Sequence, residues 1–189
     1  GITTTVNANP VASIVSNDGD NIICAGQSVT FTGAPTGTNY NFRVNGVSVQ
    51  NGAVGTYTTS TLVNGNTVDV IVTNASGCTG TSGVITMTVN ANPVAVLTSS
   101  DGDNIICSGE SVTFTGSGGT NYEFFVGGTS VQNGAGTTYV TTGLLNGQVV
   151  TVRVTNASGC SAISTGITTT VNANPVASIV SNDADNIIC

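Results

Sequence analysis

Residues 67–78 read TVDVIVTNASGC, and this stretch decides the fold. Val68, Val70 and Val72 fall at every second position, which is the period of a β-strand with one buried face. The letters TNASG that follow are turn formers. The stretch therefore predicts a strand that ends in a tight hairpin.

The same alternation recurs on both sides of this stretch. It is seen at Val29 and Phe31, at Tyr40, Phe42 and Val44, and at Ile85, Met87 and Val89. Turn formers separate the runs, among them Asn45-Gly46, Asn51-Gly52 and Asn64-Gly65. No stretch of ten residues carries a helical stripe. About seven short strands in each stretch of roughly 82 residues predict an all-β sandwich.

The chain repeats itself. The letters VNANP stand at residues 6–10, 89–93 and 171–175, with spacings of 83 and 82 residues. Phe31 maps onto Phe114 and Tyr40 onto Tyr122, and the one-residue difference falls between them, where a loop absorbs a deletion. We expect two full copies of a module, arranged head to tail, as an excerpt of a longer tandem array.

The composition excludes several classes of function. There is no His, no Lys and no Trp, and only Arg43 and Arg153 oppose nine acids, for a net charge of -7. Nucleic acid and anionic membranes are therefore poor partners, and we expect no direct membrane insertion. Without His or Lys, most proton-transfer and nucleophilic catalysis is also disfavoured, so we expect no enzyme.

Each copy resembles an immunoglobulin-like module. CAGQSVTFTG is similar to the turn into strand B and strand B itself, YNFRVNG to strand C, and TVDVIVTNASG to strand F and its hairpin. The combined order of C-x-G-x-SVTFTG, VTNASGC and VNANP resembles the immunoglobulin-like repeats of giant surface proteins from Bacteroidota. The chain departs from the usual immunoglobulin pattern in two ways: Phe42 and Phe124 replace the strand C Trp, and no cysteine lies within strand B or F.

The resemblance implies the following domains. Residues 1–7 end a preceding repeat with its last strand, residues 8–90 are repeat 1, residues 91–172 are repeat 2, and residues 173–189 begin a third. The segment that joins the repeats has no Gly/Ser linker, and its proline favours a short extended crossing. We therefore expect little freedom between modules.

Five cysteines alternate between two sites of the repeat: Cys24, Cys78, Cys107, Cys160 and Cys189. Without His or a CxxC spacing, a zinc site is improbable, so we expect disulfides in an oxidising, extracellular setting. The immunoglobulin resemblance implies that Cys24 and Cys78 lie at opposite ends of one sandwich, which favours an inter-module bond of Cys24 with Cys160. The alternative is bonding within modules, Cys24 with Cys78 and Cys107 with Cys160.

Acidic pairs recur before each Ile-Ile-Cys, at Asp18 and Asp20, Asp101 and Asp103, and Asp183 and Asp185. Loop carboxylates can bind Ca²⁺. The alternative is a solvated turn in which Asp and Asn cap their own backbone.

Asn74-Ala75-Ser76 and Asn156-Ala157-Ser158 match the N-glycosylation sequon. Asparagine in a tight hairpin is the alternative explanation for both positions. Arg43 and Arg153 are expected to pair with Asp69 and Glu123 on neighbouring strands.

These features favour a structural repeat of an extracellular, cell-surface filament, fibre or adhesin stalk, whose partners are neighbouring repeats and other copies in a bundle. The alternative is an adhesin that binds surface glycans through multivalent loops. Exposed aromatic rings would favour the alternative, and Tyr57 and Tyr139 are the two candidates.

Overall fold

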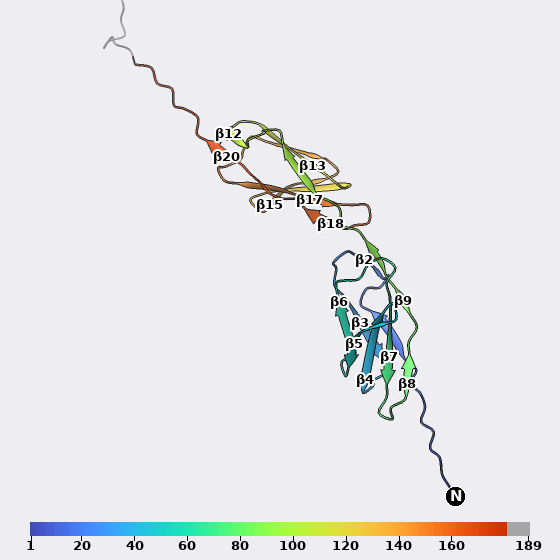
Figure 1. Ribbon diagram of the computed structural model, residues 1–189. Helices are drawn as coiled ribbons and strands as arrows, with labels where there is room; N and C mark the ends of the chain where they lie inside the picture. The colour runs from blue at the N-terminus through green and yellow to red at the C-terminus, as the bar shows by residue number, and fades with distance from the viewer. Residues whose placement is uncertain (181–189) are drawn as a thin grey trace, which may run out of the picture. The chain divides into compact units, whose positions relative to one another are not determined.

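The structure is a computed structural model and describes residues 1–180. The chain divides into two compact units, Gly1–Asn92 and Pro93–Cys189. Every regular element among residues 1–180 is a β-strand, and no helix occurs there (Figure 1). The fold is therefore all-β, as the alternating pattern predicted.

Unit 1 contains two main sheets. The first has the order β1-β3-β6, and the second has the order β5-β4-β7-β8, with β9 also paired to β7. Their bounds are β1 (Ser13–Ser16), β3 (Val29–Ala34), β4 (Asn39–Val44), β5 (Val47–Gly52), β6 (Thr56–Thr59), β7 (Thr67–Thr73), β8 (Thr79–Thr81) and β9 (Ile85–Thr86). All these pairings are antiparallel. This is the strand arrangement of an immunoglobulin-like sandwich.

A third, two-stranded sheet closes one end of the unit. In it β2 (Ile22–Cys24) runs parallel to β10 (Thr88–Asn90). The sequence predicted one continuous strand from Ile85 to Val89, but the chain breaks at Met87. The Met87 N–H donates to the Asn66 carbonyl, and β9 and β10 then pair with different partners.

The core of unit 1 lies between the two main sheets. Phe31 and Phe42 have no exposed surface, and Val68, Val70 and Val72 are buried on one face of β7. Burial of the strand C phenylalanine confirms that it takes the place of the missing Trp. Apolar packing rather than a central disulfide therefore holds the two sheets together.

Unit 2 repeats this arrangement (Figure 1). Its first sheet has the strand order β11-β13-β16, and its second sheet has the order β15-β14-β17-β18, with β19 also paired to β17. A third sheet consists of β12 and β20, which run parallel to each other. The bounds are β11 (Val96–Ser99), β12 (Ile105–Cys107), β13 (Val112–Ser117), β14 (Asn121–Val126), β15 (Thr129–Gly134), β16 (Thr138–Thr141), β17 (Val149–Thr155), β18 (Ser161–Ile163), β19 (Ile167–Thr168) and β20 (Thr170–Asn172). Phe114 and Phe124 are fully buried in its core.

A buried tyrosine closes the loop in which the two repeats differ in length. The Tyr40 hydroxyl accepts a bond from the Gly37 N–H at 2.8 Å and lies 3.3 Å from the Pro35 carbonyl. In unit 2 the Tyr122 hydroxyl donates to the Gly119 carbonyl at 2.7 Å. The tyrosine hydroxyl bonds to backbone groups of the loop in both units, so the loop tolerates the loss of a residue.

The ends of the described chain carry no strands. Residues 1–7 carry no strand in the structure, and their assignment to the last strand of a preceding repeat stays a prediction. The corresponding residues at the end of unit 1 form β10, which pairs with the Ile-Ile-Cys strand β2. Residues 173–180, assigned to the start of a third repeat, are also without strands.

Candidate functional site

The recurring VNANP segment is held on the hairpin that follows β7. The Asn74 side-chain amide donates to the Ala8 carbonyl at 3.0 Å, and the Cys78 thiol contacts the Asn7 carbonyl at 3.6 Å. The Pro10 carbonyl approaches Gly80 so closely that a Cβ there would lie 1.9 Å from the oxygen. The segment that enters unit 1 is therefore docked on its sandwich.

The next VNANP segment is held at the turn that follows β2. The Ala25 N–H donates to the Asn90 carbonyl at 2.9 Å, and the Asn92 side-chain amide donates to the Ala25 carbonyl at 2.9 Å. The same two bonds recur in unit 2, from Ser108 N–H to the Asn172 carbonyl and from Asn174 to the Ser108 carbonyl. Each segment that leaves a unit is thus bonded to that unit.

The hairpin is shaped by the asparagine of the sequon. The Oδ1 atom of Asn74 accepts bonds from the N–H groups of Ser76 and Cys78, at 3.0 and 2.9 Å. Asn156 makes the equivalent bonds to Ser158 and Cys160, both at 3.0 Å. Because the Asn74 amide nitrogen, the atom a glycan would modify, also donates to Ala8, the geometry supports the hairpin explanation for this residue. Glycosylation of Asn74 and Asn156 stays a prediction.

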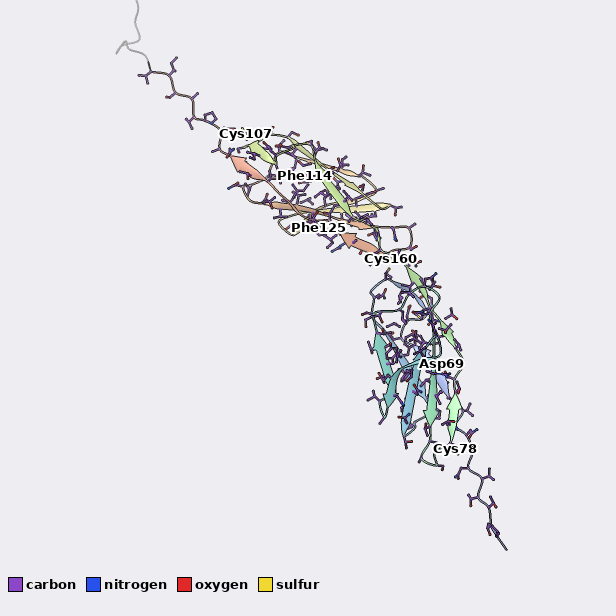
Figure 2. The ribbon with its side chains drawn as sticks, in the orientation of Figure 1. Asp69, Cys78, Cys107, Phe114, Phe125 and Cys160 are labelled. Atoms are coloured by element: carbon purple, nitrogen blue, oxygen red, sulfur yellow. The ribbon has the colours of Figure 1, made fainter. Side chains whose placement is uncertain are left out.

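The cysteines fall into two states. Cys24 and Cys160 are disulfide-bonded, whereas Cys78 and Cys107 have free thiols. The alternative within modules, Cys24 with Cys78 and Cys107 with Cys160, is therefore not formed. Figure 2 shows the physical reason in unit 2, where Cys107 and Cys160 lie at opposite ends of the sandwich. The bond of Cys24 with Cys160 stays a prediction, and Cys189 lies outside the described residues.

The acidic loops are built as turns. One carboxylate oxygen of Asp20 accepts the Ile22 N–H at 3.0 Å, and Asp103 accepts the Ile105 N–H at the same distance. Asp101 accepts the Asp103 N–H at 3.2 Å. These bonds match the alternative in which Asp side chains cap their own backbone.

Some oxygens of these loops have no partner within the structure. They are buried Oδ atoms of Asp18, Asn21 and Asn104. No group of three or more His, Cys, Asp or Glu side chains with metal-binding proximity occurs among residues 1–180. Calcium binding stays a prediction, and Asp183 and Asp185 lie outside the described residues.

Both arginines form the expected ion pairs across neighbouring strands. Arg43 makes two bonds to Asp69, one of them from Nε at 2.9 Å, and hydrogen bonding to Asp69 raises the pKa of Arg43 above its ordinary value. Arg153 donates to Glu123 at 2.9 Å and lies 5.1 Å above the ring of Phe125. The charges of the strands are thus neutralised locally.

Sequence reasoning missed the side-chain bonds that hold the crossing segments. Asn74, Asn92 and Asn174 supply them, and each carries an amide that can donate and accept at once. The signal was present in the sequence, because VNANP and VTNASGC each recur with their asparagines in place. The pattern alone did not show which carbonyls these amides meet.

None of the residues 1–180 belongs to a helix of the length and apolarity needed to cross a membrane.

Comparison with known proteins identifies no relative by sequence: no family model and no curated protein matches the chain. Several solved structures resemble it at low identity. The fibronectin(III)-like modules of Clostridium thermocellum CbhA share 13% identity over 85% of this chain and 93% of theirs, with a TM-score of 0.47. A structure of a 1.5-MDa bacterial ice-binding adhesin shares 19% identity over 89% of this chain and 67% of its own, with a TM-score of 0.38. Murine CEACAM1b shares 9% identity over 85% of this chain and 100% of its own, with a TM-score of 0.39.

Proposed function

We propose that this chain is a structural repeat of an extracellular filament, fibre or adhesin stalk, and that it supplies length and stiffness rather than catalysis. One observation carries the proposal. The segments that enter and leave unit 1 are bonded to its sandwich through Asn74, Ala25 and Asn92, at 2.9 to 3.0 Å. A segment that is bonded to the sandwich where it enters or leaves has few unrestrained residues beside the unit, which suits a spacer under load.

The disulfide chemistry supports the extracellular setting. Cys24 and Cys160 are disulfide-bonded, and disulfides persist in oxidising compartments. The low content of charged residues, at 6%, leaves few charges on the surface. Such a surface suits lateral contacts between copies in a bundle, since few like charges repel one another.

The aromatic residues give no support to the alternative of glycan binding. Tyr57 stacks on Phe31 and Phe42, with ring centroids 6.4 and 5.9 Å apart. Tyr139 stacks on Phe124 at 5.9 Å. The two tyrosines that could have been sugar platforms are thus packed against the cores. A glycan array probed with the full chain tests this alternative directly.

Small-angle X-ray scattering tests the proposed stiffness. The wild-type chain is compared with a variant that carries Gly-Ser-Gly-Ser between Asn92 and Pro93. A control variant carries the same insertion between Gly127 and Gly128, at the exposed β14–β15 turn. We expect the wild type and the control to give one narrow distribution of interatomic distances, and the Asn92 insertion to broaden it. Broad and equal distributions for all three chains would overturn the proposal.

A further inference from the structure

The four described cysteines belong to two structural classes. The strand class comprises Cys24 and Cys107, each at the end of an Ile-Ile-Cys strand, β2 or β12. The hairpin class comprises Cys78 and Cys160, each directly after Asn-Ala-Ser-Gly. One member of each class, Cys24 and Cys160, is disulfide-bonded, and the other member, Cys78 or Cys107, has a free thiol. The two free thiols are therefore of complementary classes.

Both classes lie beside the same asparagine of VNANP. In the strand class, Cys24 is the register partner of Asn90 in unit 1, and Cys107 is the register partner of Asn172 in unit 2. In the hairpin class, the Cys78 thiol contacts the carbonyl of Asn7. These three asparagines occupy the second position of VNANP. In unit 1, the strand-class cysteine thus lies at the VNANP segment that leaves, and the hairpin-class cysteine at the segment that enters.

We propose that Cys78 and Cys107 each form a disulfide with a cysteine in a further copy of this repeat. The bond in each case joins a strand-class cysteine to a hairpin-class cysteine. Cys107 takes the hairpin-class cysteine of a copy that follows, and Cys78 takes the strand-class cysteine of a copy that precedes. The inference rests on the proposed function, because it requires a tandem array. It adds a covalent bond at every joint to the hydrogen bonds already described.

Both thiols are held in place and can be reached. Cys107 is exposed and Cys78 is partly exposed. The backbone N–H of Cys107 donates to the Glu110 carboxylate at 2.9 Å, and that of Cys78 donates to Asn74 at 2.9 Å. Because local bonds already order both backbones, closing the disulfide costs little additional conformational entropy.

The bond forms by thiol–disulfide exchange with a small-molecule disulfide such as oxidised glutathione. The thiolate of one cysteine attacks a glutathione sulfur, forming a mixed disulfide and releasing one glutathione thiolate. The thiolate of the second cysteine then attacks the cysteine sulfur of the mixed disulfide and releases the second glutathione. Two protein thiols are oxidised to one disulfide, their two protons pass to the two glutathione thiolates, and one glutathione disulfide is thereby reduced to two glutathione thiols.

The test begins with the chain as it is. Alkylation with iodoacetamide before denaturation is expected to label Cys78 and Cys107 and to spare Cys24 and Cys160. The decisive variant is a tandem in which residues 1–165 precede a complete copy of 1–189. This junction keeps the natural register, because residues 166–189 repeat residues 1–24 with one change, Ala184 for Gly19. With oxidised glutathione we expect a peptide that links Cys107 of the first copy to Cys78 of the second, in nearly every molecule.

The matched control carries Cys107→Ser in the first copy only. It is expected to leave Cys78 of the second copy open to alkylation, with both copies folded by circular dichroism. The proposal is overturned if the unaltered tandem keeps both thiols alkylatable, or if Cys78 of the second copy is mapped to any other cysteine. X-ray scattering from the reduced tandem measures stiffness in the absence of the disulfide. A tandem that is stiff but forms no disulfide would contradict only the disulfide proposal, and a tandem that is flexible would contradict the spacer function.

Discussion

A buried hydroxyl group is present in one repeat and absent from the other. Met87 in unit 1 and Thr169 in unit 2 stand at equivalent positions, and each is only 1% exposed. The Thr169 hydroxyl has no hydrogen-bond partner in the structure. A buried hydroxyl without a partner costs free energy, because it has lost its bonds to water.

We therefore expect Thr169→Val to stabilise unit 2. The substitution keeps the shape of the side chain and removes the unpaired oxygen, so the free energy of unfolding should rise by about 1 kcal/mol. Urea unfolding measures it. Thr168→Val, at the exposed neighbouring position, is the control and should change stability by less than about 0.5 kcal/mol. A loss of stability in Thr169→Val would show that the hydroxyl is bonded.

Gly80 provides a residue-scale test of segment docking. A Cβ at Gly80 would meet the Pro10 carbonyl, so Gly80→Ala should displace the segment that enters unit 1. Ala162 stands at the equivalent position of unit 2, so the strand itself accepts alanine. Because the Cys78 thiol contacts Asn7 of the same segment, we expect its rate of alkylation to rise several-fold.

The Cys107 thiol of the same chain serves as the internal reference for this rate. Gly83→Ala is the matched control variant, because a Cβ at Gly83 has no atom within 4 Å. An unchanged rate at Cys78 in Gly80→Ala would contradict the docking of the entering segment.

The Arg43–Asp69 pair leads to a prediction about pH. Hydrogen bonding to Asp69 raises the pKa of Arg43, so folding favours the protonated guanidinium. The stability from this shift is fully present below the unfolded-state pKa and is lost only as pH rises through the folded-state value, far into the alkaline range. Arg43→Gln should therefore lower stability by the same amount at pH 6 and pH 9, by up to about 1 kcal/mol because the pair is still partly exposed to solvent. Urea titrations at both pH values measure the difference, and a loss at one pH only would contradict it.

Some strands could be predicted from the sequence, whereas a break between two strands could not. Strands with strict alternation, such as β7 with Val68, Val70 and Val72, were predicted because burial of one face leaves a period of two. The break at Met87 was not, because the alternation of apolar residues continues through it. Only the Asn66 carbonyl and the different partners of β9 and β10 make the chain change sheets there.

The same limit applies to the joints. Recurrence of VNANP predicted that a fixed segment joins the repeats, and the turn formers predicted the hairpin after β7. The partner of the Asn74 amide is the Ala8 carbonyl, 66 residues earlier in the chain, and no local pattern identifies so distant an acceptor. Local periodicity thus predicts elements, whereas contacts between elements depend on how the whole unit packs.

The two cores should respond separately to mutation. Phe42 is fully buried in unit 1 and Phe124 is fully buried in unit 2. Each truncation to alanine should cost about 3 to 5 kcal/mol, because it removes apolar contacts and leaves a cavity. Hydrogen exchange in reducing buffer measures the effect strand by strand. Phe42→Ala should accelerate exchange in β7 and leave β17 unchanged, and Phe124→Ala should do the reverse; acceleration of both strands by either variant would show one shared core.

At the scale of the whole molecule, the pairing of Cys24 with Cys160 predicted from the sequence determines the path of a pulling force. That bond would close a loop that contains β3 to β17, whereas β1 and β18 to β20 lie outside it and β2 ends at it. Force applied at the two ends of the chain would first load the strands outside the loop that pair with strands inside it, such as β1 on β3 and β20 on β12. Once these pairs have separated, the force would pass through the bond and the residues inside the loop would carry none of it. A spacer built in this way resists extension covalently, even if a sandwich opens.

Single-molecule pulling on the full chain tests this prediction. Under oxidising conditions, only residues outside the loop should extend. Reduction should release up to about 490 Å more, since Cys24 and Cys160 are 136 positions apart in the chain and an extended residue spans at most about 3.6 Å. A Cys24→Ser/Cys160→Ser variant should show the full extension without reductant, because it lacks the loop. Full extension of the oxidised wild type would exclude the bond and leave hydrogen-bonded strands as the elements that carry load.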